Sequence, residues 1–206
     1  MSDKRRNHRS DHRPDHRHEG RPEGPRPLTQ ARLEELALAY VARFATTQAK
    51  LRGYLQRKLR ERGFDGEGEA PVEELVGRYV ELGYVDDAAW ARTKAGSLLR
   101  RGYGARRVGE TLGQAGVAEE LRGAVRPDEG AQRGAALVLA RRRRFGPFAV
   151  QASEDPKVRD KQIAAMLRAG HPLDIARRIV ESEDADALAE WAGESADETN
   201  VPDFGD

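Results

Sequence analysis

The residues in this chain best suited to chemistry are arginines that occur in short runs. Two pairs flank a Gly-Tyr-Gly turn, and a run of four follows a later apolar stretch: Arg100-Arg101, Arg106-Arg107 and Arg141, Arg142, Arg143 and Arg144. A guanidinium group donates hydrogen bonds in a planar fork that matches phosphate and carboxylate groups. Basic residues nearer the N-terminus extend the set: Arg43, Arg57 and Lys58. These positions are the predicted contacts to a negatively charged partner.

Stabilisation of helix ends is the alternative explanation for the same arginines, because cations near a helix C-terminus interact favourably with its dipole. This accounts well for Arg100 and Arg101, which end a predicted helix. It accounts less well for the run Arg141–Arg144, because four consecutive residues point in all directions around a helix of 3.6 residues per turn. Both explanations stay open at Arg106 and Arg107.

No set of side chains has a catalytic spacing. The chain contains no cysteine, which excludes thiol chemistry. His171 precedes Pro172 at a predicted helix boundary, where a cap or surface role is expected. Asp86 and Asp87 are explained by capping the helix that follows them. The remaining histidines lie in a segment without apolar support, where a structural metal site is not expected: His8, His12, His16 and His18. The sequence therefore predicts a binding protein with no cofactor and no metal, and not an enzyme.

Charge is distributed unevenly along the chain. The net charge is +1 over 206 residues, but residues 181–206 contain ten acidic residues and no Lys or Arg. All 36 basic residues therefore lie in residues 1–180 with 25 acidic ones, which gives that part a net charge of +11. Such an excess favours contact with nucleic acid or an acidic protein surface. A solvated, arginine-rich surface would have the same composition.

The two ends of the chain differ from its middle. Residues 1–28 are rich in Arg, His, Asp and Pro, which predicts a disordered basic tail because little apolar surface can be buried. Residues 182–206 are predicted to form an acidic, mostly disordered tail, with a helical extension through Leu188 and Trp191 as an alternative for its start. This tail could compete for the basic face. No apolar run of 18 residues and no signal peptide are present, so a cytoplasmic protein without membrane contact is expected.

Between the tails, apolar residues recur at three- and four-residue spacings, which predicts an all-α protein. Helices are expected to start near Thr29 and at Pro127-Asp128, and Thr46 or Thr47 is expected to cap the helix between them that holds Leu51 and Leu55. Three of the nine predicted helices share a pattern of two aliphatic residues four apart and then a glycine: Leu55–Leu59–Gly63, Val108–Leu112–Gly116 and Ile163–Leu167–Gly170. The pattern predicts three tandem three-helix modules over residues 29–83, 84–127 and 128–181. Chance similarity among helices is the alternative.

The stretch from Leu82 to Gly116 joins the first two predicted modules. Gly83 lies where a helix C-terminal glycine is expected, and Asp86 can cap the next helix. Trp90 is predicted to be a core anchor, because a base-stacking role would need an exposed ring.

In this stretch the sequence resembles the RecX family, bacterial regulators of the RecA recombinase. The similarity covers about residues 33–180. It is most specific at Gly83-Tyr84-Val85-Asp86-Asp87-Ala88-Ala89-Trp90-Ala91 and at Arg100, Gly102, Gly104, Arg107, Val108, Leu112 and Gly116. Tyr40 to Arg43 and Leu55, Lys58, Leu59 and Gly63 also match, whereas Trp90 replaces the usual Phe of the family. The third module matches less closely.

The resemblance implies three repeated three-helix modules in a curved, elongated rod. It also implies a monomeric regulator, without cofactor or catalysis, that binds in the groove of a RecA-type recombinase filament on single-stranded DNA and inhibits recombination. A stand-alone helical DNA-binding protein that acts through its basic face is the alternative function.

Overall fold

The structure is a computed structural model that describes residues 26–151 and 155–193. Ten α-helices and one short 3-10 helix make up these residues, and no strand is longer than an isolated bridge. The helices are α1 (Gln30–Arg43), α2 (Gln48–Arg62), α3 (Val72–Glu81), α4 (Asp87–Arg100), α5 (Ala105–Gln114), α6 (Glu119–Ala124), α7 (Glu129–Arg143), η1 (Gly146–Phe148), α8 (Pro156–Arg168), α9 (Leu173–Glu181) and α10 (Ala185–Gly193). The predicted all-α class is confirmed. None of the described helices is long and apolar enough to cross a lipid bilayer.

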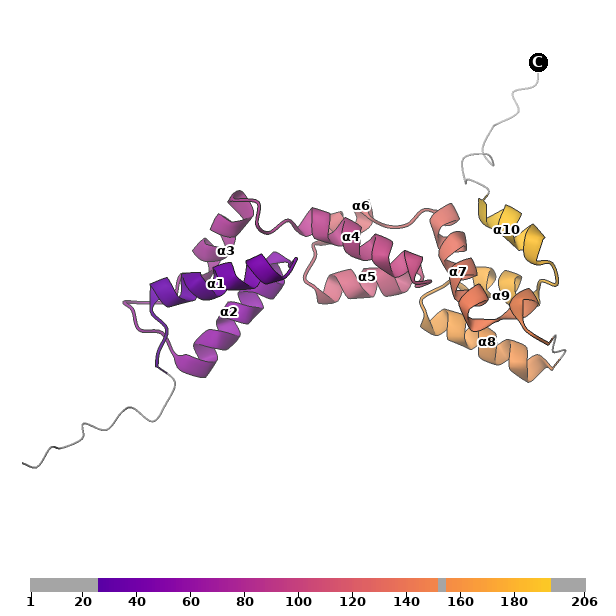
Figure 1. Cartoon of the computed structure of the whole chain (residues 1–206), viewed down its shortest axis with the longest axis horizontal. Coiled ribbons are helices and arrows are strands. Elements are labelled where there is room, and N and C mark those ends of the chain that lie inside the picture. The colour runs from indigo at the N-terminus through magenta and orange to yellow at the C-terminus, as the bar shows by residue number, and fades with distance from the viewer. Residues whose placement is uncertain (1–25, 152–154, 194–206) are drawn as a thin grey trace, which may run out of the picture.

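The helices form three groups in a row, which makes the described part of the chain an elongated rod (Figure 1). Each group has its own apolar core. We call them the first module (α1–α3), the middle module (α4–α6) and the third module (α7–α10). Their cores are centred on Leu33, Leu51, Leu55 and Val76, on Ala91, Val108 and Leu112, and on Leu139, Met166, Ile179 and Trp191.

Local sequence signals set where the helices begin. The side chains of Thr29, Thr47, Asp86 and Asp128 each accept a hydrogen bond from a backbone N–H in the first turn of α1, α2, α4 and α7. These contacts satisfy N–H groups that have no partner within the helix. The predicted cap at Asp86 and the predicted helix starts near Thr29 and Asp128 are therefore confirmed, and of the two candidates before α2 it is Thr47 that forms the cap.

Three module boundaries differ from the predicted ones. Leu28 is fully buried and exchanges backbone hydrogen bonds with the chain after α2, so it is not part of a disordered tail. Val85 is 2% exposed and packs in the first core, not the middle one. Residues 185–193 form α10, which buries Leu188 and Trp191 against the third core, so the helical extension given as the alternative for the start of the acidic tail is confirmed. Leu28 and α10 are placed by contacts with residues far along the chain, at Gly63 and Arg133, which local periodicity does not show. The predicted histidine-rich and far C-terminal tails, residues 1–25 and 194–206, lie outside the described residues.

The modules join where one helix begins against the end of another. At the first joint, between the first and middle modules, the Thr47 hydroxyl donates to the carbonyl of Ala115 at the end of α5 (2.6 Å). The backbone N–H of Gln48 donates to the Asp87 carboxylate (2.9 Å). A Cβ on Gly116 would overlap the Cβ of Ala49, so the two helix ends meet in van der Waals contact. Asp87 therefore links two modules, a role beyond the predicted cap.

The second joint, between the middle and third modules, repeats this arrangement. The start of α5 lies against the end of α8: Gly104 N–H donates to Ala169 O (3.0 Å) and Arg106 N–H donates to Gly170 O (3.3 Å). Because the positive end of one helix dipole faces the negative end of the other, the stacking of α5 on α8 is electrostatically favourable. The equivalent helices α2, α5 and α8 thus follow one another end to end along the rod.

Candidate functional site

The structure divides the predicted contact residues into two groups. Four of them are paired with glutamates on their own helices: Arg57 and Lys58 with Glu61, and Arg106 and Arg107 with Glu110. The other seven are exposed and make no ion pair within the described residues: Arg43, Arg100, Arg101, Arg141, Arg142, Arg143 and Arg144. Unpaired guanidinium groups are the ones that can bind an added phosphate or carboxylate without breaking an existing contact.

Six of these seven residues come from helix ends near the second joint. Arg100 and Arg101 end α4, and the following Gly102 is so close to α7 that a Cβ there would lie 2.8 Å from the backbone nitrogen of Leu139. The run Arg141–Arg144 begins two residues after Leu139, at the C-terminal end of α7. We call these six residues, Arg100, Arg101 and Arg141–Arg144, the arginine surface. Packing of the Gly102 turn against α7 is what brings the two runs to the same joint.

Helix-end stabilisation accounts for part of this arrangement. Arg100 lies in the last turn of α4, and Arg141 to Arg143 lie in the last turn of α7, where they oppose the negative end of the dipole. Arg101 also packs over the ring of Tyr103, and Arg141 over that of Phe148. The helix dipole accounts for Arg141 to Arg143 but not for Arg144, and the ring contacts involve only Arg101 and Arg141. Neither explanation therefore accounts for the whole run of exposed charges.

Arg144 has a backbone conformation that favours a different residue. It caps α7 with φ 57° and ψ 53°, and no other described non-glycine residue has a positive φ. Glycine is the usual residue at this position because a Cβ is strained in the left-handed region. Because backbone strain concentrates at functional sites, the left-handed conformation makes Arg144 a candidate for a binding role.

We therefore expect the change Arg144→Gly to stabilise the protein while weakening its binding to anionic partners. Relief of the left-handed strain is worth about 1 kcal/mol, which thermal unfolding of the full chain would detect. A loss of stability would show that the guanidinium group itself holds the end of α7.

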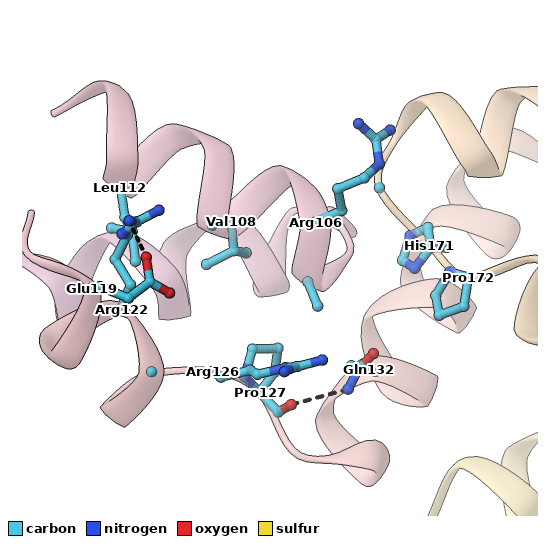
Figure 2. A pocket seen from close by; sticks show the side chains of 14 residues that line it. Arg106, Val108, Leu112, Glu119, Arg122, Arg126, Pro127, Gln132, His171 and Pro172 are labelled. Carbon is cyan, nitrogen blue, oxygen red and sulfur yellow. Dashed lines mark hydrogen bonds and ion pairs between the residues drawn. The ribbon is translucent and has the colours of Figure 1, made fainter. Parts of the chain in front are cut away.

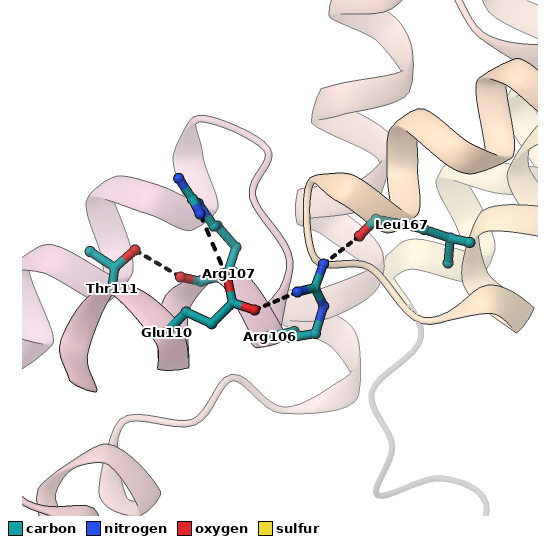
Figure 3. A network of polar contacts seen from close by, with 5 residues as sticks. All are labelled: Arg106, Arg107, Glu110, Thr111 and Leu167. Atoms are coloured by element: carbon teal, nitrogen blue, oxygen red, sulfur yellow. Dashed lines mark hydrogen bonds and ion pairs between the residues drawn. The ribbon is translucent and has the colours of Figure 1, made fainter. Parts of the chain in front are cut away.

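Arg106 and Arg107 have structural partners at the second joint. The guanidinium group of Arg106 pairs with Glu110 and donates from Nη2 to Leu167 O in the last turn of α8 (2.8 Å) (Figure 3). Arg107 Nη1 lies 3.6 Å from Glu110, and the Thr111 hydroxyl donates to the Arg107 carbonyl (2.8 Å). Arg106 thus holds the middle module to the third. Removing its charge would change the joint as well as any binding.

His171 also belongs to the second joint, and its predicted surface or cap role is wrong. The residue is only 3% exposed, and its Nε2 lies 3.0 Å from the carbonyl oxygen of Gly102, to which it donates. The turn before α9 could not be recognised as buried from sequence, because the covering surface comes from residues some 70 positions earlier. Burial lowers the pKa of the His171 imidazole below its usual value of 6.5.

The lowered pKa predicts that the protein loses stability in mild acid. Below about pH 6.5 the unfolded chain binds a proton at His171 that the folded chain does not, so the free energy of unfolding falls as the pH falls. The expected loss is at most about 1.4 kcal/mol per pH unit. Urea unfolding at pH 7.5 and pH 5.5 measures it. The variant His171→Asn keeps the tail histidines and should lose this part of the pH dependence; an equal dependence in both proteins would contradict the assignment.

Trp90 packs against the middle core, as the sequence predicted, but it is only partly buried because it lies at the first joint. Its indole Nε1–H donates to Ala45 O (3.2 Å), and the ammonium group of Lys50 lies 4.1 Å from the ring centroid. Tyr84 beside it is 55% exposed. The ring therefore ties two modules together while leaving part of its surface accessible.

Comparison with known proteins gives the family of this chain. No protein-family model matches the sequence. The chain is 34% identical over 169 residues to the regulatory protein RecX of Myxococcus xanthus strain DK1622. The aligned residues cover 78% of this chain and 90% of that protein. The chain is 32% identical to regulatory protein RecX of Mycobacterium sp. strain JLS, with 76% and 86% covered. The crystal structure of RecX from Lactobacillus salivarius has the same fold, with a TM-score of 0.58 at 16% identity over 75% of this chain and 96% of that one. Since it has the same helical fold and relatives of 32–34% identity over most of their length, this chain belongs to the RecX family of regulatory proteins.

Proposed function

We propose that this protein binds a RecA-type recombinase filament on single-stranded DNA and restrains its recombination and repair activities. The observation that carries the proposal is the arginine surface, in which six exposed arginines lie near one joint without ion-pair partners in the described residues. A nucleoprotein filament offers both DNA phosphates and acidic protein side chains, and a fork-shaped guanidinium group binds either. Membership in the RecX family supports a regulatory role.

The elongated shape supports a partner that is itself extended. The rod places three modules in a row, so its exposed charges can contact successive subunits of a filament (Figure 1). Tight joints favour this role because a rigid rod loses less conformational freedom on binding than three loosely tethered modules would. No enzymatic chemistry enters the proposal.

Filament co-sedimentation and recombinase activity test the proposal together. At sub-stoichiometric amounts the protein should pellet with recombinase filaments and lower both DNA-dependent ATP hydrolysis and strand exchange. Unchanged activity with no co-sedimentation would refute it. An unrelated basic protein of similar net charge controls for unspecific attraction to DNA.

The alternative function is binding to bare DNA without a recombinase, and the same unpaired arginines favour it. Bare DNA should then bind with a steep salt dependence, because each neutralised phosphate releases a counterion. Measuring affinity for bare single strands and for filaments over one salt series separates the two. Tight filament binding with bare-DNA binding no better than that of the unrelated basic protein would reject the alternative.

A further inference from the structure

A pocket of about 440 Å³ lies where the middle module meets the third (Figure 2). Its apolar wall is formed by Val108 and Leu112 of α5 and by Pro127 before α7. Its basic side is formed by Arg122 of α6 and Arg126 after it. The volume is in the range of pockets that hold small ligands or large side chains.

The charged groups of this pocket leave an excess of positive charge. Arg126 is exposed and makes no ion pair in the described part of the chain, and in Figure 2 its side chain lies across the pocket. Arg122 pairs with Glu119, the only acidic residue of the lining, and its Nε is buried without a hydrogen-bond partner among the described residues. The third arginine, Arg106, is held by Glu110 and Leu167 O. A carboxylate is the group that these cations would accept.

A second buried polar group also faces this site. His171 lines the pocket and is 3% exposed. Its Nε2 donates to Gly102 O, so Nδ1 carries a lone pair, and this atom is buried with no partner among the described residues. Because an unsatisfied buried acceptor is unfavourable, it favours a ligand that donates an N–H, as a peptide backbone does. The chemistry of the pocket thus matches an acidic peptide with an apolar anchor.

We infer that the chain's own C-terminal segment, residues 194–206, binds in this pocket, with Phe204 against the apolar wall. The segment contains five acidic residues and no Lys or Arg, and it ends in Asp203-Phe204-Gly205-Asp206. The carboxylates of Asp203 and Asp206 then face Arg122 and Arg126. The arginine surface has more charge, but attraction by charge alone is weakened by salt.

The place where α10 ends puts this segment within reach of the pocket. Arg133 of α7 donates from Nη1 to Trp191 O (3.2 Å), two residues before the end of α10 at Gly193. Gln132, the neighbour of Arg133, lines the pocket. The 13 residues that follow Gly193 can span about 45 Å when extended. The inference does not rest on the proposed function, because it concerns contacts within one chain.

Disulfide trapping in the full chain tests this contact, since the protein has no cysteine of its own. One cysteine replaces Thr199 and the other replaces Gly123, which lines the pocket and has open space around its Cβ position. The control pair joins Thr199→Cys to Gly134→Cys. Gly134 has equally open space and lies two positions from Gln132, about 200° around α7. Position 134 is therefore near the end of α10 but outside the pocket, and its rate of disulfide formation measures the effect of nearness alone.

We expect the Gly123 pair to form an intramolecular disulfide about tenfold faster than the Gly134 pair, as burial of one aromatic anchor would give. Adding Phe204→Ala to the Gly123 pair should slow its disulfide formation to the rate of the Gly134 pair. Adding Arg126→Ala and measuring at high salt should have the same effect. Equal rates for the two pairs, or no effect of Phe204→Ala, would overturn the inference. Disulfides that form only between chains would overturn it as well. Circular dichroism of each variant confirms that the helices are intact.

Discussion

Replacing Gly104 with alanine is expected to destabilise the protein by about 3 kcal/mol and to loosen the second joint. An alanine Cβ at this position would overlap Gly170 O and would lie 2.6 Å from the backbone nitrogen of His171. Both are main-chain atoms, so no side chain can rotate away. The backbone of Gly104 itself has φ −81°, which alanine adopts freely. The effect therefore isolates the close approach between modules from any backbone strain.

Several contacts of the second joint would be lengthened together. They are the hydrogen bonds from Gly104 N–H to Ala169 O, from Arg106 N–H to Gly170 O, from Arg106 Nη2 to Leu167 O and from His171 Nε2 to Gly102 O. The unfolding of the third module would then be less strongly coupled to that of the middle module. The urea transition should therefore broaden or split as well as shift.

Gly109→Ala is the matched control for this experiment. Gly109 lies in the same helix, α5, and a Cβ there meets nothing within 4 Å. Alanine should stabilise the helix by up to about 1 kcal/mol, because it loses less backbone entropy than glycine. Opposite signs for the two variants would establish the joint as a tight contact. If both variants gain stability, the joint opens readily in solution.

The sequence predicted the individual helices well because their signals are local. The cap at Asp86 and the apolar spacing of Val108 and Leu112 each depend on residues within one or two turns. The three repeat glycines Gly63, Gly116 and Gly170 also end their helices with positive φ, as the pattern indicated. Short-range periodicity carries this information directly.

The joints could not be predicted because they depend on which helix end meets which. Each repeat glycine faces a distant segment: Gly63 O accepts from Leu28 N–H, Gly116 faces Ala49, and Gly170 faces Arg107. The burial of His171 and the structural use of Arg106 follow from these encounters. The basic side of the pocket was missed for the same reason, since Arg122 belongs to a short helix with no buried residue of its own and Arg126 follows that helix.

The joints change how the arginines should be tested. Arg107 matches the family pattern, yet it and Arg106 already share Glu110 as an ion-pair partner. The run in α7 has no such partner among the described residues. Arginines with structural partners are therefore separated along the chain from those without them, and Arg142 and Arg143 can be changed without removing any joint contact of the described residues.

The double change Arg142→Gln with Arg143→Gln is expected to weaken binding to filaments on single-stranded DNA at least about tenfold at low salt. Each guanidinium group that contacts a phosphate or carboxylate contributes a charge-assisted hydrogen bond of about 1.5 kcal/mol or more. If both contact DNA phosphates, the slope of log affinity against log salt should fall by about 1.4, at 0.7 for each phosphate on a single strand. Stability should fall by only about 1 kcal/mol, because both side chains are exposed and unpaired within the described residues and lose only their interaction with the dipole at the end of α7.

Arg159→Gln with Lys161→Gln is the charge-matched control for this double change. Both residues are exposed on α8, outside the arginine surface, so the net charge changes equally while the helix end of α7 stays intact. Filament co-sedimentation of the two variants over one salt series compares them directly. Equal losses would show that only total charge matters, and the arginine surface would then be no specific site. A tenfold loss confined to the α7 variant, with an unchanged salt slope, would instead indicate contacts to acidic side chains of the recombinase rather than to DNA.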